Sequence, residues 1–444
     1  MTTPTPPWPL PDPRSPAQIA ADREAVRRQV EVLSSPDGLL DDQPASDNVV
    51  LRIGRRATRA DTTRFAVVRR AGGPVLPAEN ELVVQATDAQ LQQAGDTLDG
   101  YTEVRRAGRR ARVFRHPGNT AEDLLADAGR LRDRKIEANI NPVAPLGYVI
   151  KGDAFPGRTT GRGTFTGADA DPTVRVAVID TGRAAENRTD GWFTGVIAKD
   201  TDPLNVVEPL DRNDYFSGHG TFTAGIVRQV APRCEVMVYR FTGNDGIGTD
   251  AAAADAMIKA AAEAGDRRLI INASFGTPAV DGVPPLALRE AVELIATRHP
   301  HVLIVASAGN DGADERLYPA GFSRHGVIAV GALNPDLTGA EFSNRGAWVH
   351  CSTVGVGVVS TFVAGLLPPE DDLGVDDIRF GKNAWATWSG TSFTAPQISG
   401  AVAYLCSQQT GLLPKDAFTR LLTGRPTLNK FGTVVHILPG TPTA

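Results

Sequence analysis

The chain has 444 residues, of which 41% are hydrophobic, and a formal net charge of -5 at pH 7. This length predicts two or three domains. The near-neutral balance gives no basis for a nucleic-acid partner, and no apolar run reaches the length that spans a membrane. We therefore expect neither nucleic acid nor membrane among its partners.

The N-terminal end and the cysteines predict a cytoplasmic location. Residues 1–16 contain seven prolines but no basic start and no apolar core of a signal peptide. We expect this tip to be extended and mobile. Cys234, Cys351 and Cys406 are scattered and lack C-x-x-C spacing, which argues against a disulfide framework and for a reducing compartment or buried thiols. For Cys351 we expect a place in the core.

A charged helix is predicted after the proline-rich tip. Ser15 is placed as its N-cap with Pro16 at the first helical position, and the helix extends to about Leu33. A polar linker completes a region that we delimit as 1–48. The short β-like runs 49–53 and 65–68 follow, and we assign them no role.

A small α+β domain is predicted over residues 49–150, with a core at 81–142. Its elements alternate in the order βαββαβ, which is that of a ferredoxin-like sandwich. They are the strand 81–85, a helix 88–98 capped by Asp88, the hairpin strands 101–106 and 110–115, a helix 120–134 and the strand 135–140.

The hairpin of this domain is rich in arginine, at Arg105, Arg106, Arg109, Arg110 and Arg112. Basic and acidic residues nearly balance over residues 1–150. We therefore interpret the run as a solvated edge of the sheet rather than a nucleic-acid or partner surface.

Two turns after residue 170 carry candidate catalytic side chains. The apolar, β-branched run 174–179 predicts a buried parallel strand, and Asp180 follows it at the sheet edge where ligands of open α/β sheets bind. His219 lies between Gly218 and Gly220, ahead of an apolar helical pattern. Glycines on both sides let the backbone pass close to another element, so the imidazole can be placed tightly.

A third turn, 388–396, ends in an apolar helical segment that extends to about Cys406 and contains Ser392. A serine at such a position gains open approach, neighbouring backbone N–H groups and the positive end of a helix dipole. Serine and threonine are also the preferred N-caps of ordinary helices. By itself this stretch leaves both interpretations open.

Together these turns form a nucleophile, a base and a residue that orients the base, and they resemble the subtilisin-like serine proteases. The matching signatures are Asp180-Thr181-Gly182, His219-Gly220-Thr221 and Gly390-Thr391-Ser392 with Ala395-Pro396. Further segments fall in the family's order: Val230-Ala231-Pro232, 271–276, 306–310, Tyr318-Pro319-Ala320 and Phe342-Ser343-Asn344.

The resemblance implies a doubly wound, mostly parallel α/β sheet over residues 151–444 and a serine endopeptidase without a cofactor, acting on polypeptides. Ser392 would attack the peptide carbonyl, His219 would accept and return the proton, and Asp180 would orient the imidazole. Asn310 resembles the family's oxyanion asparagine, with the N–H of Ser392 as second donor. A turn after a buried strand is the alternative for Asn310.

The substrate pocket is also carried over from the resemblance. The segments Ser274-Phe275-Gly276 and Ala308-Gly309 would wall the primary pocket, and the first would pair with substrate as an added strand. Leu317 corresponds to a pocket-floor position often held by a small residue. Its bulk predicts preference for small or medium apolar residues, whereas Asp311 would instead favour basic ones.

The sequence departs from the family in places. Phe222 stands where the family commonly has a second histidine, and the segment between Ile226 and Val230 is too short for a calcium loop that many relatives have. Most bacterial relatives are exported, and we see no signal, so the alternative to a cytoplasmic location is export by a route that the sequence does not show. Acidic residues in an apparent insertion, 364–382, could bind a cation, but we interpret them as a solvated loop and expect no metal.

The domain before the catalytic part resembles the family's inhibitory propeptide, whose last strand leads into the active-site cleft. Residues 141–148 would be the corresponding tail, which makes the N-terminal domain an expected intramolecular inhibitor. An unrelated small α/β domain is the structural alternative. The functional alternative is a catalytically restrained binding module that keeps the fold and recruits a partner through its N-terminal region.

Overall fold

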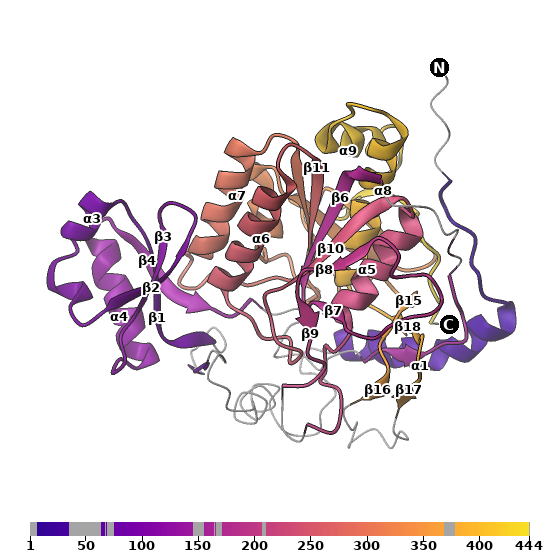
Figure 1. Cartoon of the computed structure of the whole chain (residues 1–444), viewed down its shortest axis with the longest axis horizontal. Coiled ribbons are helices and arrows are strands. Elements are labelled where there is room, and N and C mark those ends of the chain that lie inside the picture. Colours follow the sequence, from indigo (N-terminus) through magenta and orange to yellow (C-terminus); the bar gives the residue numbers. More distant parts are fainter. Residues whose placement is uncertain are drawn as a thin grey trace.

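The computed structural model describes residues 7–34, 64–66, 68, 75–144, 155–163, 165, 171–206, 210–367 and 378–443. It contains a small four-stranded lobe and a larger body built around a nine-stranded sheet (Figure 1). Within these residues no helix combines the length and the hydropathy needed to cross a lipid bilayer.

The nine-stranded sheet has the order β19-β20-β14-β13-β12-β11-β6-β10-β8. Every neighbouring pair is parallel except β19 and β20, so the predicted mostly parallel sheet is confirmed. Its strands are β6 (Asp171–Asp180), β8 (Val196–Ala198), β10 (Cys234–Arg240), β11 (Arg268–Ala273), β12 (Val302–Ser307), β13 (Ile328–Leu333), β14 (Cys351–Val354), β19 (Thr427–Leu428) and β20 (Gly432–Val434).

Helices cover both faces of this sheet because the central strand β6 is apolar on both. Val174, Val176 and Val178 belong to one buried cluster, and Ala177 and Ile179 to the other, as the two-residue period of a strand requires. The first cluster also contains residues of α5 (His219–Val230), α8 (Ala395–Gln408) and α9 (Pro414–Leu422). The second contains residues of α6 (Asp250–Ala264) and α7 (Leu286–Arg298).

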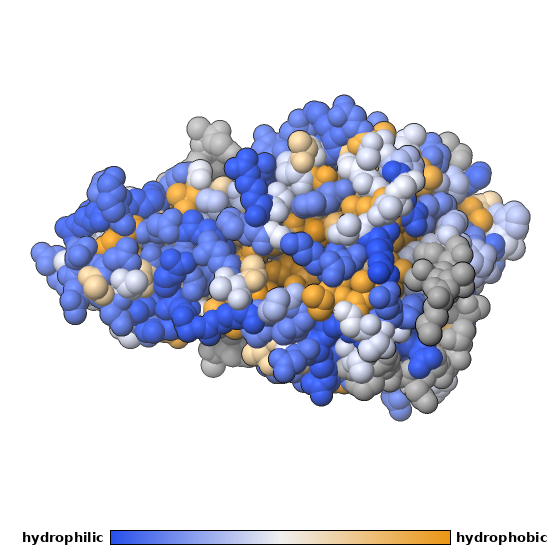
Figure 2. All heavy atoms as spheres, turned by 90° about the horizontal axis from the view of Figure 1, so that it is seen from above, coloured by the Kyte–Doolittle hydropathy of each residue, from blue (hydrophilic) through white to orange (hydrophobic). Residues whose placement is uncertain are grey.

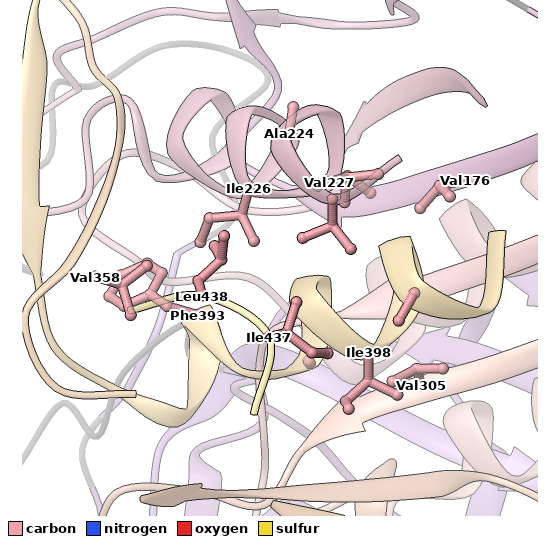
Figure 3. Close-up of a cluster of buried hydrophobic side chains, with 14 of the residues drawn as sticks. Val176, Ala224, Ile226, Val227, Val305, Val358, Phe393, Ile398, Ile437 and Leu438 are labelled. Carbon is pink, nitrogen blue, oxygen red and sulfur yellow. The ribbon is translucent and has the colours of Figure 1, made fainter. Parts of the chain in front are cut away.

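The first cluster joins the two helices that carry the candidate base and follow the candidate nucleophile. Figure 3 shows Ile226 and Val227 of α5 and Ile398 of α8 converging on the same apolar space, with Val305 of β12 beneath them. Full burial of each such side chain contributes roughly 1.5–3 kcal/mol. The packing therefore fixes the position of the start of α5 relative to the start of α8.

Smaller sheets complete the body. A three-stranded sheet has the order β15-β18-β5, and two pairs, β7 with β9 and β16 with β17, lie apart from it. Most residues of the predicted acidic loop, 368–377, lie outside the described residues, and β16 and β17 flank them. The elements are β5 (Gly157–Arg158), β7 (Arg183–Ala184), β9 (Thr201–Asp202), β15 (Val358–Thr361), β16 (Gly365–Leu366), β17 (Arg379–Phe380), β18 (Trp385–Trp388), η2 (Ala320–His325) and η3 (Thr391–Phe393).

The lobe has the βαββαβ order predicted for residues 81–142, and its strands pair antiparallel in the order β2-β3-β1-β4. The predicted helix over 88–98 is broken into two parts, and its N-cap is Thr87 rather than Asp88. Seen from above, the lobe's surface is largely hydrophilic (Figure 2). Its elements are β1 (Pro77–Gln85), α3 (Asp88–Gln92), η1 (Gly95–Leu98), β2 (Thr102–Ala107), β3 (Ala111–Arg115), α4 (Ala121–Asp133) and β4 (Glu137–Pro142).

The run 65–68 extends this sheet, since Phe65 and Val68 form antiparallel bridges with Ala78 and Val75. The run 49–53 lies outside the described residues.

The arginine-rich hairpin was predicted to be a solvated edge of the sheet, but the side chains of two of its arginines contact the body. Arg105 pairs with Asp255 of α6 at 3.2 Å, and Arg110 pairs with Glu290 and Glu293 of α7 at 3.2 and 3.0 Å. The local charge balance could not reveal these carboxylates because they lie on the body, far along the chain.

The N-terminal helix α1 (Pro16–Ser34) begins where the sequence predicted. Ser15 accepts a hydrogen bond from Gln18 N at 3.3 Å and its own N–H bonds to Gln18 Oε1 at 2.8 Å, which forms a capping box. Figure 1 shows α1 against the body below β15 and β18. The tip before it is also held, because the ring of Trp8 packs edge-on against that of Tyr404 and Leu10 N donates to Ile437 O at 2.9 Å. The expectation of a mobile tip is therefore wrong for residues 8–14.

Candidate active site

Asp180 and His219 form a buried hydrogen-bonded pair. Asp180 is the last residue of β6 and His219 the first of α5. His219 Nδ1 lies 2.8 Å from each carboxylate oxygen of Asp180. This contact uses Nδ1 as the donor and leaves Nε2 to act as a base.

Close backbone approach brings the two turns together, as the flanking glycines predicted. A Cβ on Gly220 would lie 2.3 Å from Gly182 O, which no larger residue could tolerate without movement. Gly220 N also donates to Thr181 Oγ1 at 3.1 Å. A substitution at Gly220 would push the histidine turn away from the aspartate turn.

Asp202 is a second buried carboxylate behind this pair, and it was missed in the sequence. Its Oδ2 accepts from Thr181 Oγ1 and from Gly218 N, both at 2.9 Å, and its Oδ1 accepts from Leu204 N and from the amide of Asn244. Burial raises the pKa of Asp202 to about 6, against these donors. Because it joins the residue after Asp180 to the residue before His219, Asp202 ties both turns to one loop.

Ser392 lies in the short helix η3, ahead of α8. Gly390, with φ of +151°, supplies the turn before it. Ser392 O accepts from Ser274 Oγ at 2.8 Å, and Ser392 Oγ donates to Ser274 O at 3.3 Å. Thr394, not Ser392, is the N-cap of α8, so the capping interpretation of Ser392 is wrong.

The loop that carries Ser392 lies against the base. The ring of Phe393 is 5.4 Å from the imidazole of His219, and the ring of Trp388 is also 5.4 Å from it in an edge-on arrangement. The rings of Trp388 and Phe393 are 5.1 Å apart, so both pack against the same side of the imidazole and restrict its movement there.

Asn310 is held by the residue next to the candidate nucleophile. Its Oδ1 accepts from Thr391 N at 2.9 Å and from Thr391 Oγ1 at 2.8 Å. A Cβ on Gly390 would lie 3.5 Å from Asn310 Nδ2, so the amide donors lie beside the same turn. A free turn asparagine would have no such anchor. Thr391 is a further residue whose role was missed, although it lies within the quoted signature.

The residues expected to wall the substrate pocket converge around Leu317. A Cβ on Gly276 would lie 2.9 Å from Leu317 Cβ, and a Cβ on Gly309 would lie 2.6 Å from Leu317 Cδ1. Leu317 therefore fills the space between the two glycine segments. Ala308, before Gly309, is buried and its N donates to Val330 O at 2.9 Å, which fixes this segment to β13.

The side chain of Phe275 points away from any substrate. It is buried, and its ring packs 4.5 Å from that of Phe241 in the cluster under α6 and α7. Only the backbone of Phe275 is then available for pairing with a peptide. Ser274 is buried too and contacts Ser392 as described.

No group of three or more histidine, cysteine or acidic side chains is arranged to hold a metal within the described ranges. Cys234, Cys351 and Cys406 are free and buried. Burial raises the pKa of Cys234 and of Cys406 to about 12, and that of Cys351 also rises, so none is poised as a thiolate.

A carboxylate, an imidazole and a hydroxyl thus lie in three turns of a parallel α/β fold, with an amide donor beside the turn of the hydroxyl. These are the groups that a serine hydrolase of the Asp-His-Ser type uses. Residues 171–428 match the model of the subtilase family. The chain belongs to this family, and the resemblance read from the motifs is confirmed.

The relatives are proteases. The chain is 32% identical over 244 residues to the thermophilic serine proteinase of Bacillus sp. (strain AK1), a match covering 52% of each chain. It is 28% identical over 286 residues to the intracellular serine protease of Paenibacillus polymyxa, covering 61% of this chain and 75% of that one. It is 29% identical over 261 residues to subtilisin DY of Bacillus licheniformis, covering 56% of this chain and 82% of that one. The chain thus spans about half the length of the first of these relatives.

Among solved structures, fervidolysin from Fervidobacterium pennivorans, a keratinolytic enzyme related to subtilisin, superposes with a TM-score of 0.57 at 17% identity. The superposition covers 86% of this chain and 63% of fervidolysin. At that identity the likeness shows the fold alone.

Proposed function

We propose that this chain is a serine endopeptidase that works through an acyl-enzyme on Ser392. His219 removes the hydroxyl proton as the oxygen attacks a peptide carbonyl and returns it to the leaving amine, and Asp180 stabilises the imidazolium. Water, activated by the same base, then hydrolyses the ester between the acyl group and Ser392. The observation that carries the proposal is the 2.8 Å contact between His219 Nδ1 and Asp180, beside the turn that holds Ser392.

Asn310 and the N–H of Ser392 would hold the negative charge that develops on the carbonyl oxygen. The acceptor side of the Asn310 amide is occupied by Thr391, so its donors need no reorganisation when the charge appears. Loss of one such donor costs about 10²–10³ in kcat in proteases of this kind.

For specificity we propose a short primary pocket with Leu317 at its floor. Its side chain occupies the space that a large aromatic residue would need between Gly276 and Gly309. The competing idea, that Asp311 selects basic residues, is less well supported because Asp311 Oδ2 already accepts from Asn344 Nδ2 at 3.2 Å. A peptide-library profile favouring Phe or Tyr before the cut would contradict the Leu317 proposal.

We also propose that the lobe inhibits the site from within the same chain, as a propeptide-like domain. Glu290 of α7 accepts hydrogen bonds from Arg109 N at 3.0 Å, from Arg110 N at 3.2 Å and from Gln85 Nε2 at 3.0 Å. Around it, apolar residues of β1, the hairpin, α6 and α7 share a buried cluster. The lobe is thus docked on the two helices of one face.

The tail of the lobe pairs with the body through an isolated antiparallel bridge. Val143 forms an antiparallel bridge with Thr249, and Ala144 N donates to Gly248 O at 3.0 Å. Residues 145–154 lie outside the described residues. The chain resumes at Phe155, whose ring is 5.2 Å from that of Tyr215, shortly before His219. The two described ends therefore contact the body at Gly248 and at Tyr215, which lie on either side of His219 in the sequence.

The cytoplasmic location is retained as a proposal. Free cysteines buried in the core are compatible with a reducing compartment. One relative is named an intracellular serine protease.

A fluorophosphonate probe tests the proposed activity. Wild type should be labelled and Ser392→Ala should not, with intact mass read in the same samples. Cleavage between Lys151 and Phe165 in wild type alone would also establish self-processing. If neither full-length nor N-terminally trimmed protein is labelled, the endopeptidase proposal fails and the restrained binding module takes its place.

A further inference from the structure

We infer that Gln29 of α1 is a positioning residue for the turn that carries Ser392. The N-terminal segment, residues 7–34, is then part of the working enzyme rather than a leader to the inhibitory lobe. The inference rests on the proposed function, because it concerns the same nucleophile.

The buried side-chain amide of Gln29 bonds to β18, the strand just before the turn of Ser392. Its Nε2 donates to Thr387 O at 3.0 Å and to Phe155 O at 2.7 Å, and its Oε1 accepts from Ser389 Oγ at 2.8 Å. The residue is 4% exposed. A buried amide that uses both its donor and acceptor sides fixes its partners in register, and an unmatched replacement would leave them unpaired.

The contact passes directly to the catalytic turn. Ser389 Oγ, which donates to Gln29, also accepts from Gly357 N at 3.0 Å, and Gly390 N donates to Gly355 O at 2.8 Å. Ser389 and Gly390 are thus held between α1 on one side and the loop 355–357 on the other. Ser392 follows two residues later.

A second set of contacts anchors the segment where it enters α1. Arg14 and Asp22 form a buried ion pair at 3.0 Å, Arg14 also pairs with Asp12 at 2.9 Å, and Asp22 accepts from Thr159 Oγ1 at 2.8 Å. Arg14 additionally bonds Thr441 near the C-terminal end. Both ion pairs lie within the segment, and the bonds of Asp22 to Thr159 and of Arg14 to Thr441 join this charged group to the body.

The segment also belongs to the apolar core of the body. Val26 and Leu33 of α1 lie in the same buried cluster as the helices α5 and α8. A cut anywhere in residues 35–63 or 145–154 would therefore leave the segment bound without a covalent link.

The first test compares full-length wild type with Gln29→Met, which keeps the side chain's length and removes its polar atoms. The expected result is a fall in kcat, and in the rate of fluorophosphonate labelling, of about tenfold with KM within about twofold, because small misplacements act on the reacting geometry. Leu33→Ala is the matched control on the same helix face. It should lower the melting temperature without this loss of kcat.

The outcomes separate the two proposals. If wild type is not labelled, the proposed function fails and this inference with it. If wild type and Gln29→Met are labelled equally fast, or Leu33→Ala slows labelling as much, only the inference is overturned.

A second test covers the case in which Gln29→Met does not fold. A site-specific protease sequence is placed within residues 40–47 of the full chain, which is then cut. The N-terminal fragment should co-elute with the rest on gel filtration, and the cut complex should be labelled at the rate of wild type. If the fragment is then removed, labelling should be lost. Release of the fragment with unchanged labelling, or co-elution with lost labelling, would overturn the inference.

Discussion

The N-terminal segment and the four-stranded lobe both precede the catalytic part and both bind it, but by different chemistry. The segment docks through a buried amide, Gln29, through the bonds of Arg14 to Thr441 and of Asp22 to Thr159, and through side chains in the body's own core. The lobe docks through a separate small apolar cluster, through the buried carboxylate of Glu290, and through arginines that are about half exposed, such as Arg105 and Arg110.

This difference bears on which part can leave. Exposed ion pairs contribute about 0–1 kcal/mol each and weaken in salt, whereas each buried polar group left unpaired costs about 1–3 kcal/mol. The lobe is held in part by exposed pairs, and its apolar cluster is separate from that of α5 and α8, so we expect its release after a cut, as the proposed inhibitor requires. The segment is held by buried polar groups and by the core of the body, so we expect it to stay bound.

The largest effect is expected from a buried charge in each contact. Val26→Asp, on α1, should cost about 3–5 kcal/mol and abolish most peptidase activity, because the unpaired carboxylate prevents docking beside the nucleophile. Val83→Asp, on the lobe's buried face, should instead raise the activity toward an added peptide substrate. Activity and melting temperature of both full-length variants are the measurements.

The exposed Val104 of β2 offers a matched valine-to-aspartate control that should change neither quantity. Equal loss of activity in the Val26 and Val83 variants would erase the distinction between the two regions.

Glu290 provides a finer test of the lobe. Glu290→Ala removes the acceptor of two backbone N–H groups and of Gln85 and should weaken lobe binding by about 2–5 kcal/mol. Glu293→Ala removes only a partly exposed pair with Arg110 and should cost about 0–1 kcal/mol. The readout is inhibition of the cut enzyme by its own lobe. Similar inhibition constants for the two variants would mean that Glu290 is not the anchor.

The last effect is spread over several pH units and is a pH dependence of stability under the lobe. Asp250 accepts hydrogen bonds from Ala287 N at 2.9 Å and Leu288 N at 2.8 Å, joining α6 to α7, and burial raises its pKa to about 7. A raised carboxyl pKa means that the folded state binds a proton that the unfolded state has released. This contribution to stability is full below about pH 4 and is lost as pH rises toward 7, at up to about 1.4 kcal/mol per pH unit.

Melting curves of wild type and Asp250→Asn between pH 4 and 8 would test this sign. Asp250→Asn should lack this part of the fall in stability with rising pH. Gln29→Met, which alters the α1 contact, should show the same fall as wild type. A steeper slope in Asp250→Asn would show that the sign is wrong.

Local patterns predicted the catalytic fold and the lobe's elements well. The β-branched run before Asp180 predicted a buried strand, which β6 confirms, and a glycine is needed where Gly220 meets Gly182 O. The family signatures then named Ser392 and Asn310, because short motifs carry both the turn and the chemical group.

Residues that act through long-range contacts gave no local signal. Gln29 lies 360 positions from Ser389 on an ordinary charged helix, and Asp202 stands in a short strand with no motif around it. The prediction for the arginine hairpin failed for the same reason, because the charge balance of residues 1–150 does not include Asp255 or Glu290. Single sequences do not show which distant side chains a fold will bring together.

The bond between Thr391 and Asn310 has a kinetic consequence. Because Thr391 precedes Ser392 in the chain and fixes the amide of Asn310, a movement of the turn would displace the proposed attacking oxygen and the proposed charge-stabilising donor together. A heated enzyme should then pass from full to no activity without a population that still forms the acyl-enzyme slowly. Active-site titre and turnover would decline along one curve.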